Sequence, residues 1–240
     1  MNDLVSIDMS GLPSTQLGSS DDFEKSTANS GFLQRLQLYS KGKAIDKGLV
    51  KPGHWGIPKS VDSVTDLSDS IDLICFARRL KAIDMSDRDA IITIYQTGNP
   101  EYSRIVESSG EPDSGCSHGP SFLVWERETE LFLELFMGTK SSRPEAKFVF
   151  PYLPLTQARI DELKAEGHDT NNLEPHFAEP FTLKSRLVEK GSWSWFVPVV
   201  HDCSVPFETV PEKNDIITQM TKFLSVSDTA VTKRDANRAR

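Results

Sequence analysis

Basic residues gather beside aromatic residues in three stretches of the sequence. Side chains of these types hold single-stranded nucleic acid, because rings stack on bases while lysine and arginine neutralise phosphates. The sequence therefore predicts a binding surface for a polyanion with unpaired bases. Its predicted members are Arg35, Tyr39, Lys41, Lys43, Trp55, Phe76, Arg78, Arg79, Lys81, Trp125, Phe136, Lys140, Arg143 and Lys147, of which Trp125 lies outside the three stretches.

The first stretch lies between residues 32 and 55. It holds five cations, Arg35, Lys41, Lys43, Lys47 and Lys51, and Asp46 as its one carboxylate. Glycines in the same stretch predict a mobile loop, which suits contact with a phosphate backbone. The alternative interpretation is that the cations are merely solvated and that the strand aromatics belong to the core.

Two cysteine–histidine pairs form a second candidate constellation. Cys116 and His118, together with His201 and Cys203, could supply a tetrahedral zinc site. The usual spacing leaves at least two residues between paired ligands, so the sequence favours unrelated residues and no metal or other cofactor. Nothing marks a strained turn that would make either cysteine a nucleophile.

The stretch from Gly138 to Ser142 superficially resembles a phosphate-binding loop. In that motif a glycine precedes the lysine directly, whereas here Thr139 separates Gly138 from Lys140. Nucleotide hydrolysis is therefore not expected, and the sequence predicts a protein that is not an enzyme.

Composition limits the class of protein. The chain has 240 residues, a formal net charge of −8 and 38% hydrophobic residues, which is enough for one core. It has no apolar run of membrane-spanning length and no secretory signal, and its three cysteines suggest a reducing compartment. We therefore expect a cytoplasmic protein. The acidic balance argues against indiscriminate wrapping of nucleic acid but permits a local basic face.

The apolar pattern has mostly a period of two, which is typical of strands. It predicts a mainly β domain with minor α, built as an antiparallel and partly open barrel. One or two short helices accompany it. The predicted strands are 32–39, 71–80 and 90–95, the hairpins are 121–126 with 130–137 and 181–188 with 193–200, and the helices are 156–166 and 214–224.

The chain divides into one domain and two tails. Residues 1–30 predict a disordered acidic arm, residues 31–224 the β domain, and residues 225–240 a flexible basic tail. The arm would compete with nucleic acid for the basic surface or recruit replication or recombination proteins. The oligomeric state stays open, because edge strands of an open barrel would permit a homo-oligomer.

The densest aromatic run is Trp193-Ser194-Trp195-Phe196. In a strand, Trp193 and Trp195 share one face and Phe196 lies on the other. One face must belong to the core. The other is either a packed layer or a stacking platform, and the core interpretation is favoured for this run.

Three segments carry a resemblance to a known group of proteins. They are residues 31–38, residues 114–125 and residues 136–143, followed by the segment from Trp193 to Pro206. The arrangement resembles phage-encoded single-stranded DNA-binding proteins of the oligonucleotide/oligosaccharide-binding (OB) type, over residues 32–207. The resemblance implies a barrel of the OB type and sequence-tolerant DNA binding in phage replication or recombination, in the host cytoplasm if the protein is phage-encoded. The alternative is a structural or assembly protein of a phage that binds no nucleic acid.

Overall fold

The computed structural model describes residues 33–60, 62–84, 91–96, 99–109, 111, 114–165, 167–171, 174, 176–225 and 229–232. Strands dominate this part of the chain, as expected. The strands are β1 (Arg35–Leu38), β2 (Trp55–Ser60), β3 (Ser63–Asp66), β4 (Ser70–Asp84), β5 (Ile91–Gln96), β6 (Cys116–Glu126), β7 (Leu131–Phe136), β8 (Pro180–Lys190), β9 (Trp193–Asp202) and β10 (Thr229–Thr232). The helices are α1 (Lys43–Asp46), α2 (Pro100–Ser108), α3 (Gln157–Ala165) and α4 (Lys213–Ser225), with short 3₁₀ turns η2 (Ala146–Phe148) and η3 (Phe150–Tyr152).

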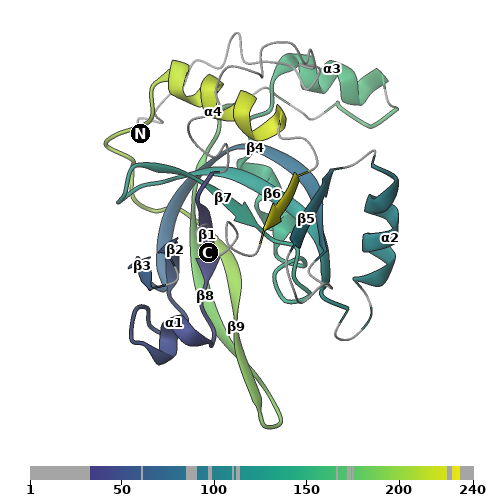
Figure 1. Ribbon diagram of the computed structural model, residues 1–240. Coiled ribbons are helices and arrows are strands. Elements are labelled where there is room, and N and C mark those ends of the chain that lie inside the picture. The colour runs from purple at the N-terminus through teal and green to yellow at the C-terminus, as the bar shows by residue number, and fades with distance from the viewer. Residues whose placement is uncertain are drawn as a thin grey trace.

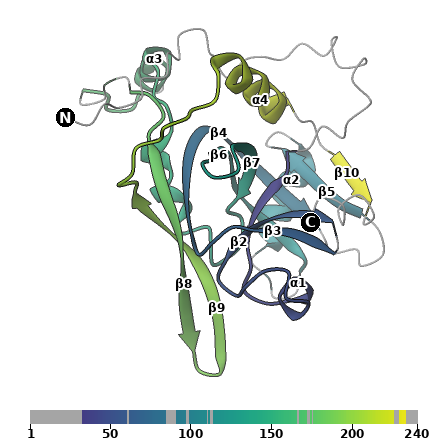
Figure 2. The same cartoon turned by 90° about the vertical axis from the view of Figure 1, so that its left-hand side faces the viewer.

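Strand β4 organises the sheet. It is 15 residues long, and one of its edges pairs with β6 along most of that length. Its other edge pairs with β8 near its start and with β5 near its end. A register shift between Cys75 and Ala77 marks a bulge, which increases the local bend of a strand. The sheet consequently curls around β4, and Figures 1 and 2 show this long bent strand.

The sheet is mixed, and the expectation of a purely antiparallel sheet was wrong. Strand β1 pairs with β2 in the antiparallel sense and with β7 in the parallel sense, with Arg35 opposite Glu134. The other strand pairs of the described residues are antiparallel. Hydrophobic alternation reports which face of a strand is buried, but it carries no information about the direction of the partner strand.

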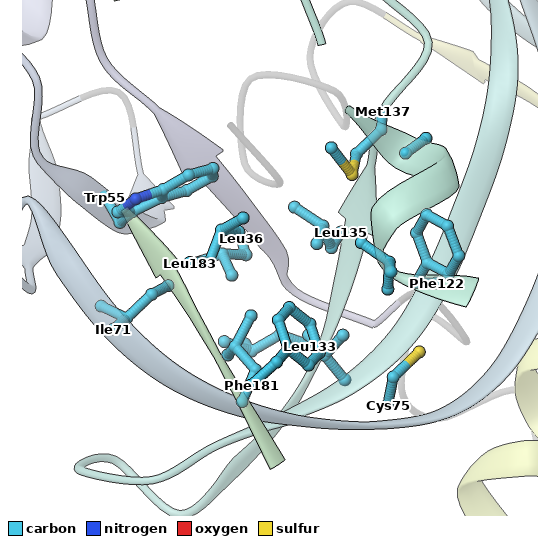
Figure 3. Close-up of a cluster of buried hydrophobic side chains, with 14 of the residues drawn as sticks. Leu36, Trp55, Ile71, Cys75, Phe122, Leu133, Leu135, Met137, Phe181 and Leu183 are labelled. Atoms are coloured by element: carbon cyan, nitrogen blue, oxygen red, sulfur yellow. The ribbon is translucent and has the colours of Figure 1, made fainter. Parts of the chain in front are cut away.

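The inner face of the curled sheet holds the larger core. Alternation on β7 sends Leu133 and Leu135 to this face, and Phe122 of β6 meets them there. Figure 3 shows Leu36, Trp55, Ile71, Phe181 and Leu183 pointing into the same enclosed space from β1, β2, β4 and β8. This core therefore joins strands that lie far apart in the sequence.

The outer face carries a second core beneath α4. Ile216, Met220 and Phe223 of α4 pack with Phe76 and Trp125 of the sheet. The apolar residues of α4 recur at helical spacing, as the sequence predicted. Helix α4 lies across one end of the sheet in both views (Figures 1 and 2).

Strand β9 returns to the segment that follows β1. The backbone N–H of Phe196 donates to Ser40 Oγ at 3.0 Å, and Gly53 lies against the Phe196 ring. At Gly53, where φ is +81°, an added Cβ would lie 2.5 Å from that ring. Beyond this contact the β8–β9 hairpin extends away from the rest of the sheet (Figures 1 and 2).

Several predicted elements are confirmed, and others differ. Both hairpins and the helices at 157–165 and 213–225 are present. Helix α2 was not predicted, although Asn99 caps it and Pro100 occupies its first turn. In the segment expected to be a flexible tail, residues 229–232 form β10 and pair with β5. The acidic arm, residues 1–30, lies outside the described residues. None of the helices that the structure describes is long and apolar enough to cross a membrane.

Candidate functional site

A pocket of about 660 Å³ opens where β1, the loop before α1, β9 and the end of β7 meet. Its charged lining residues, among those the structure describes, are Arg35, Lys41 and Lys43, with no carboxylate. Four rings line it as well, those of Tyr39, Trp55, Phe136 and Phe196. In a chain with a net charge of −8, this local excess of cations beside rings is the feature that distinguishes the pocket.

Lys41 joins the pocket to the β8–β9 hairpin. Its Nζ lies 5.6 Å from the centroid of the Trp193 ring, within the range of a cation–π contact. Trp193 is the first residue of β9, directly after the turn of the hairpin, and its side chain is 68% exposed. A ring this exposed contributes little to a core, so its open surface is accessible to a ligand.

The rings of the pocket wall differ in accessibility. Trp55 is 2% exposed and packs with the inner core, so it forms the floor of the pocket. Burial raises the pKa of Tyr39, which therefore stays a neutral hydrogen-bonding group at physiological pH. Phe136 and Phe196 are half-buried. These two rings and Trp193 are the ones with surface left for stacking.

A hydroxyl-rich turn forms another part of the wall. Thr139, Ser141 and Ser142 line the pocket after the end of β7. Thr139 Oγ1 and Ser142 Oγ lie 2.7 Å apart, and each accepts a hydrogen bond from the backbone N–H of the other residue. These reciprocal bonds fix the turn and keep its hydroxyls at the pocket.

Two of the predicted phosphate ligands are buried beneath the outer face instead. Lys81 Nζ donates to Glu134 Oε1 at 2.7 Å, and Arg79 donates to the same oxygen at 3.0 Å. Ser121 Oγ donates to that oxygen at 2.5 Å. The Lys81 side chain is fully buried and that of Arg79 is 11% exposed. We call Arg79, Lys81, Ser121 and Glu134 the buried network.

Charge and burial compete within the buried network. Burial alone would raise the pKa of Glu134, but the charges of Lys81, Arg79 and Arg35 outweigh it and hold that pKa below the ordinary carboxyl range. Burial lowers the pKa of Lys81 to about 8, although Glu134 opposes the shift. Both groups are therefore charged in most molecules at pH 7. Arg79 also donates to the carbonyl of Phe223 at 2.5 Å, so the network anchors α4.

The predicted stacking role is wrong for four aromatic residues, one of which is Tyr39, 7% exposed in the pocket wall. Phe76 is 1% exposed and Trp125 is 3% exposed, both in the core beneath α4. Trp55 is almost as buried, in the inner core. Because a ring without exposed surface cannot stack on a base, these residues support the fold. The predicted role of Arg79 and Lys81 as phosphate ligands is wrong as well, because both belong to the buried network.

The remaining predicted residues are Lys140, Arg143 and Lys147, in the segment that follows β7, and Arg78 of β4, which contacts that segment. Arg143 donates to the carbonyl of Gly138 at 2.9 Å, and Lys140 is exposed beside it. Arg78 lies over the Phe150 ring and Lys147 over the Phe148 ring, at 4.5 and 4.9 Å. The structure therefore separates the predicted surface into the pocket, the buried network and this third group.

The cysteine–histidine pairs are not brought together. Cys116 lies opposite Asp84 at the end of β4, whereas His201 lies opposite Thr182, which pairs with Asp72 near the start of β4. Asp72 and Asp84 are twelve positions apart on β4, which corresponds to about 40 Å along the strand at about 3.3 Å per residue. Among the described residues, no group of three or more metal-ligating side chains forms.

The thiol of Cys116 is also not an activated nucleophile. Burial raises its pKa, and the neighbouring Asp84 carboxylate raises it further. A thiol that is held protonated reacts slowly, because the thiolate is the reactive form. His118, in the same strand, pairs through Nδ1 with Ser109 Oγ at 2.6 Å rather than with the cysteine.

Lys41 and the Trp193 ring that it contacts form what we call the pocket rim, and sequence reasoning selected neither Trp193 nor Phe196 of the pocket wall. The aromatic run was assigned mainly to the core because of its density. The signal that marks Trp193 is its position directly after the Gly191-Ser192 turn, since a ring at the tip of a projecting hairpin has few neighbours.

Comparison with family models, curated proteins and solved structures gives no match to this chain.

Proposed function

We propose that this protein binds single-stranded DNA with little sequence preference, through the pocket and the adjoining face of the β8–β9 hairpin. The curled sheet would act as a partly open OB-type barrel with the pocket at its mouth. The protein would bind its ligand without catalysis and would serve in phage DNA replication or recombination, in the host cytoplasm.

The observation that carries this proposal is the composition of the pocket wall. Lys41, Lys43 and four rings line one cavity with no carboxylate among the described lining residues, while the third lining cation, Arg35, lies 4.0 Å from Glu134 Oε2. The rest of the molecule supplies the acidic excess, so the cations are not the consequence of a generally basic surface. A polyanion with accessible bases uses both kinds of side chain.

The site differs from the one that the sequence predicted. Lys41 and Lys43 are the proposed phosphate contacts, because they line the pocket without a carboxylate partner among its described residues, whereas Arg35 lies 4.0 Å from Glu134. Trp193 and Phe136 are the proposed stacking rings, because they retain exposed surface. The hydroxyls of the 139–142 turn would donate to phosphate or sugar oxygens.

Oligo(dT) titration of two hairpin variants tests the proposal. Trp193→Ala removes the exposed ring, and base–aromatic stacking contributes about 1–3 kcal/mol per base. We expect the dissociation constant for labelled oligo(dT) to rise roughly fivefold or more. Leu187→Ala is the matched control, since Leu187 is 48% exposed on the same hairpin and is not a ring.

The pair of variants gives distinct results. Weakened binding in Trp193→Ala with unchanged binding in Leu187→Ala supports the proposal. Equal affinities in wild type and both variants would remove Trp193 from the site. Absence of oligo(dT) binding by the wild type at low salt would overturn the function and favour the assembly-protein alternative.

A further inference from the structure

A second group of rings and cations lies outside the pocket. The Phe148 side chain is 48% exposed and that of Phe150 is 39% exposed. Lys147 Nζ lies 4.9 Å from the centroid of the Phe148 ring, and Arg78 Cζ lies 4.5 Å from that of Phe150. Two neighbouring exposed rings thus each carry a cation on one face, which is the arrangement that base stacking exploits. We call Arg78, Lys147, Phe148 and Phe150 the second patch.

Helix α2 adds a third ring to this region. Burial raises the pKa of Tyr102, and the charges of Arg143 and Arg78 act against that rise. Burial likewise lowers the pKa of Arg78, whose charge interacts with Tyr102. The guanidinium groups of Arg78 and Arg143 therefore lie near one phenol, although they come from different parts of the chain.

One segment of the chain connects the pocket to the second patch. Ser142 lines the pocket, and Arg143 follows it directly in the chain. The backbone then turns through Glu145 into η2 and η3, which carry Phe148 and Phe150. A strand that leaves the pocket over the 139–142 turn would meet Arg143 next and the second patch after it.

Charge selects the occupant of this surface. The cations Arg78, Arg143 and Lys147 outnumber Glu145, the carboxylate of the same turn. An apolar protein surface would leave these cations without compensation, whereas the phosphates of a nucleic-acid strand supply it. The exposed rings would contact its bases.

We propose that the second patch is a further contact for the same single strand, used only by strands longer than the pocket accommodates. This inference rests on the proposed function. The pocket and hairpin would bind a short oligonucleotide alone, and the second patch would bind the continuation of a longer strand. Long oligonucleotides should therefore bind more tightly than short ones. Substitutions in the second patch should remove this gain and leave the binding of short oligonucleotides unchanged.

The experiment compares oligo(dT) of about 5 and about 20 nucleotides, within and beyond the site sizes of single OB folds. The proteins are wild type, Phe148→Ala, Arg78→Gln and the control Phe177→Ala. Phe177 is 42% exposed and has no cation placed over its ring among the described contacts. Thermal unfolding checks that every variant is folded.

For the long oligonucleotide, we expect Phe148→Ala and Arg78→Gln each to weaken binding about fivefold or more. For the short one, we expect no change, and Phe177→Ala should equal wild type at both lengths. The ratio of variant to wild-type affinity cancels the larger number of registers on a longer strand.

The outcomes separate the two proposals. If the wild type binds neither oligonucleotide, the proposed function itself fails. If the wild type binds and both patch variants equal it at both lengths, the second contact is overturned while the function stands. Equal losses on short and long strands would also overturn it, because the patch would then belong to the first site. A protein partner would be indicated by intact DNA binding together with loss of self-association in Phe148→Ala, and that result too would overturn the second contact.

Discussion

The buried network and the pocket rim contain the same kinds of side chain in opposite settings. Lys81 is fully buried, has Glu134 at 2.7 Å and lies under the Phe136 ring at 4.9 Å. Lys41 is exposed, lies over Trp193 and has no carboxylate among the described residues that line its pocket. Each lysine contacts a ring, but only Lys41 is exposed enough to neutralise a phosphate and so release the counterions condensed on a nucleic acid.

The difference shows what makes a basic residue available for binding. A cation inside the fold requires a carboxylate, because an uncompensated buried charge is costly. Glu134 supplies that compensation to Lys81 and Arg79. A cation at the surface needs no such partner, so its charge remains available to a polyanion. The partner, rather than the residue type, thus separates structural from binding cations.

Removal of Glu134 should produce the largest effect on stability. In Glu134→Ala, Lys81 and Arg79 would lose their carboxylate while still buried, and breaking a buried pair costs about 3–5 kcal/mol. We expect urea unfolding to report a loss of that size in the free energy of unfolding. Glu128→Ala, at an exposed turn position, should change it little. Equal stabilities in the two variants would show that Glu134 is not compensating the buried cations.

Lowering the pH should show the same dependence of stability on the charge of Glu134 in the wild-type protein. The pKa of Glu134 lies below its unfolded value, so its contribution to stability is complete above the unfolded pKa and is lost as the pH falls toward the folded pKa. We expect stability to begin to fall below about pH 5 and to continue falling below about pH 3, because the folded pKa lies well below the ordinary carboxyl range. The fall should be smaller in Glu134→Gln than in Glu128→Gln. Parallel curves for the two variants would contradict the assignment.

The smallest expected effect is that of substituting Lys41 and Lys43 on the salt dependence of DNA binding. Each phosphate contact on a single strand contributes about 0.7 to the slope of log K against log salt. Substituting both Lys41 and Lys43 by glutamine should therefore reduce the slope by about 1.4. Lys47→Gln is the control, because Lys47 pairs with Asp62 and does not line the pocket. An unchanged slope in the double variant would place the phosphates elsewhere.

Much of the secondary structure follows from the sequence. Alternation assigns Leu133 and Leu135 to one face of β7 and Phe132 and Glu134 to the other, and the turn predicted at 189–192 lies within two residues of the end of β8 at Lys190. These features depend on neighbours in the chain, which a sequence displays directly. The parallel pairing of β1 with β7 depends on residues about a hundred positions apart, and no local pattern encodes it.

The site was harder to predict for the same reason. Arg79 and Lys81 alternate with apolar residues just as surface cations on a strand would. Their burial is set by Glu134 on β7 and by α4, which are remote in the sequence. Trp193 was assigned mainly to the core because its neighbours are aromatic, whereas its exposure follows from the projecting hairpin. Long-range packing therefore decides which of the chemically suitable residues are accessible.

The most direct test of the account is a titration of the wild-type protein with labelled oligo(dT) and matched duplex DNA, each at two salt concentrations. We expect tight binding of the single strand at low salt, weaker binding of the duplex and a marked loss of affinity at the higher salt. Binding that is absent at low salt, or that is equal for single strand and duplex, would contradict the account.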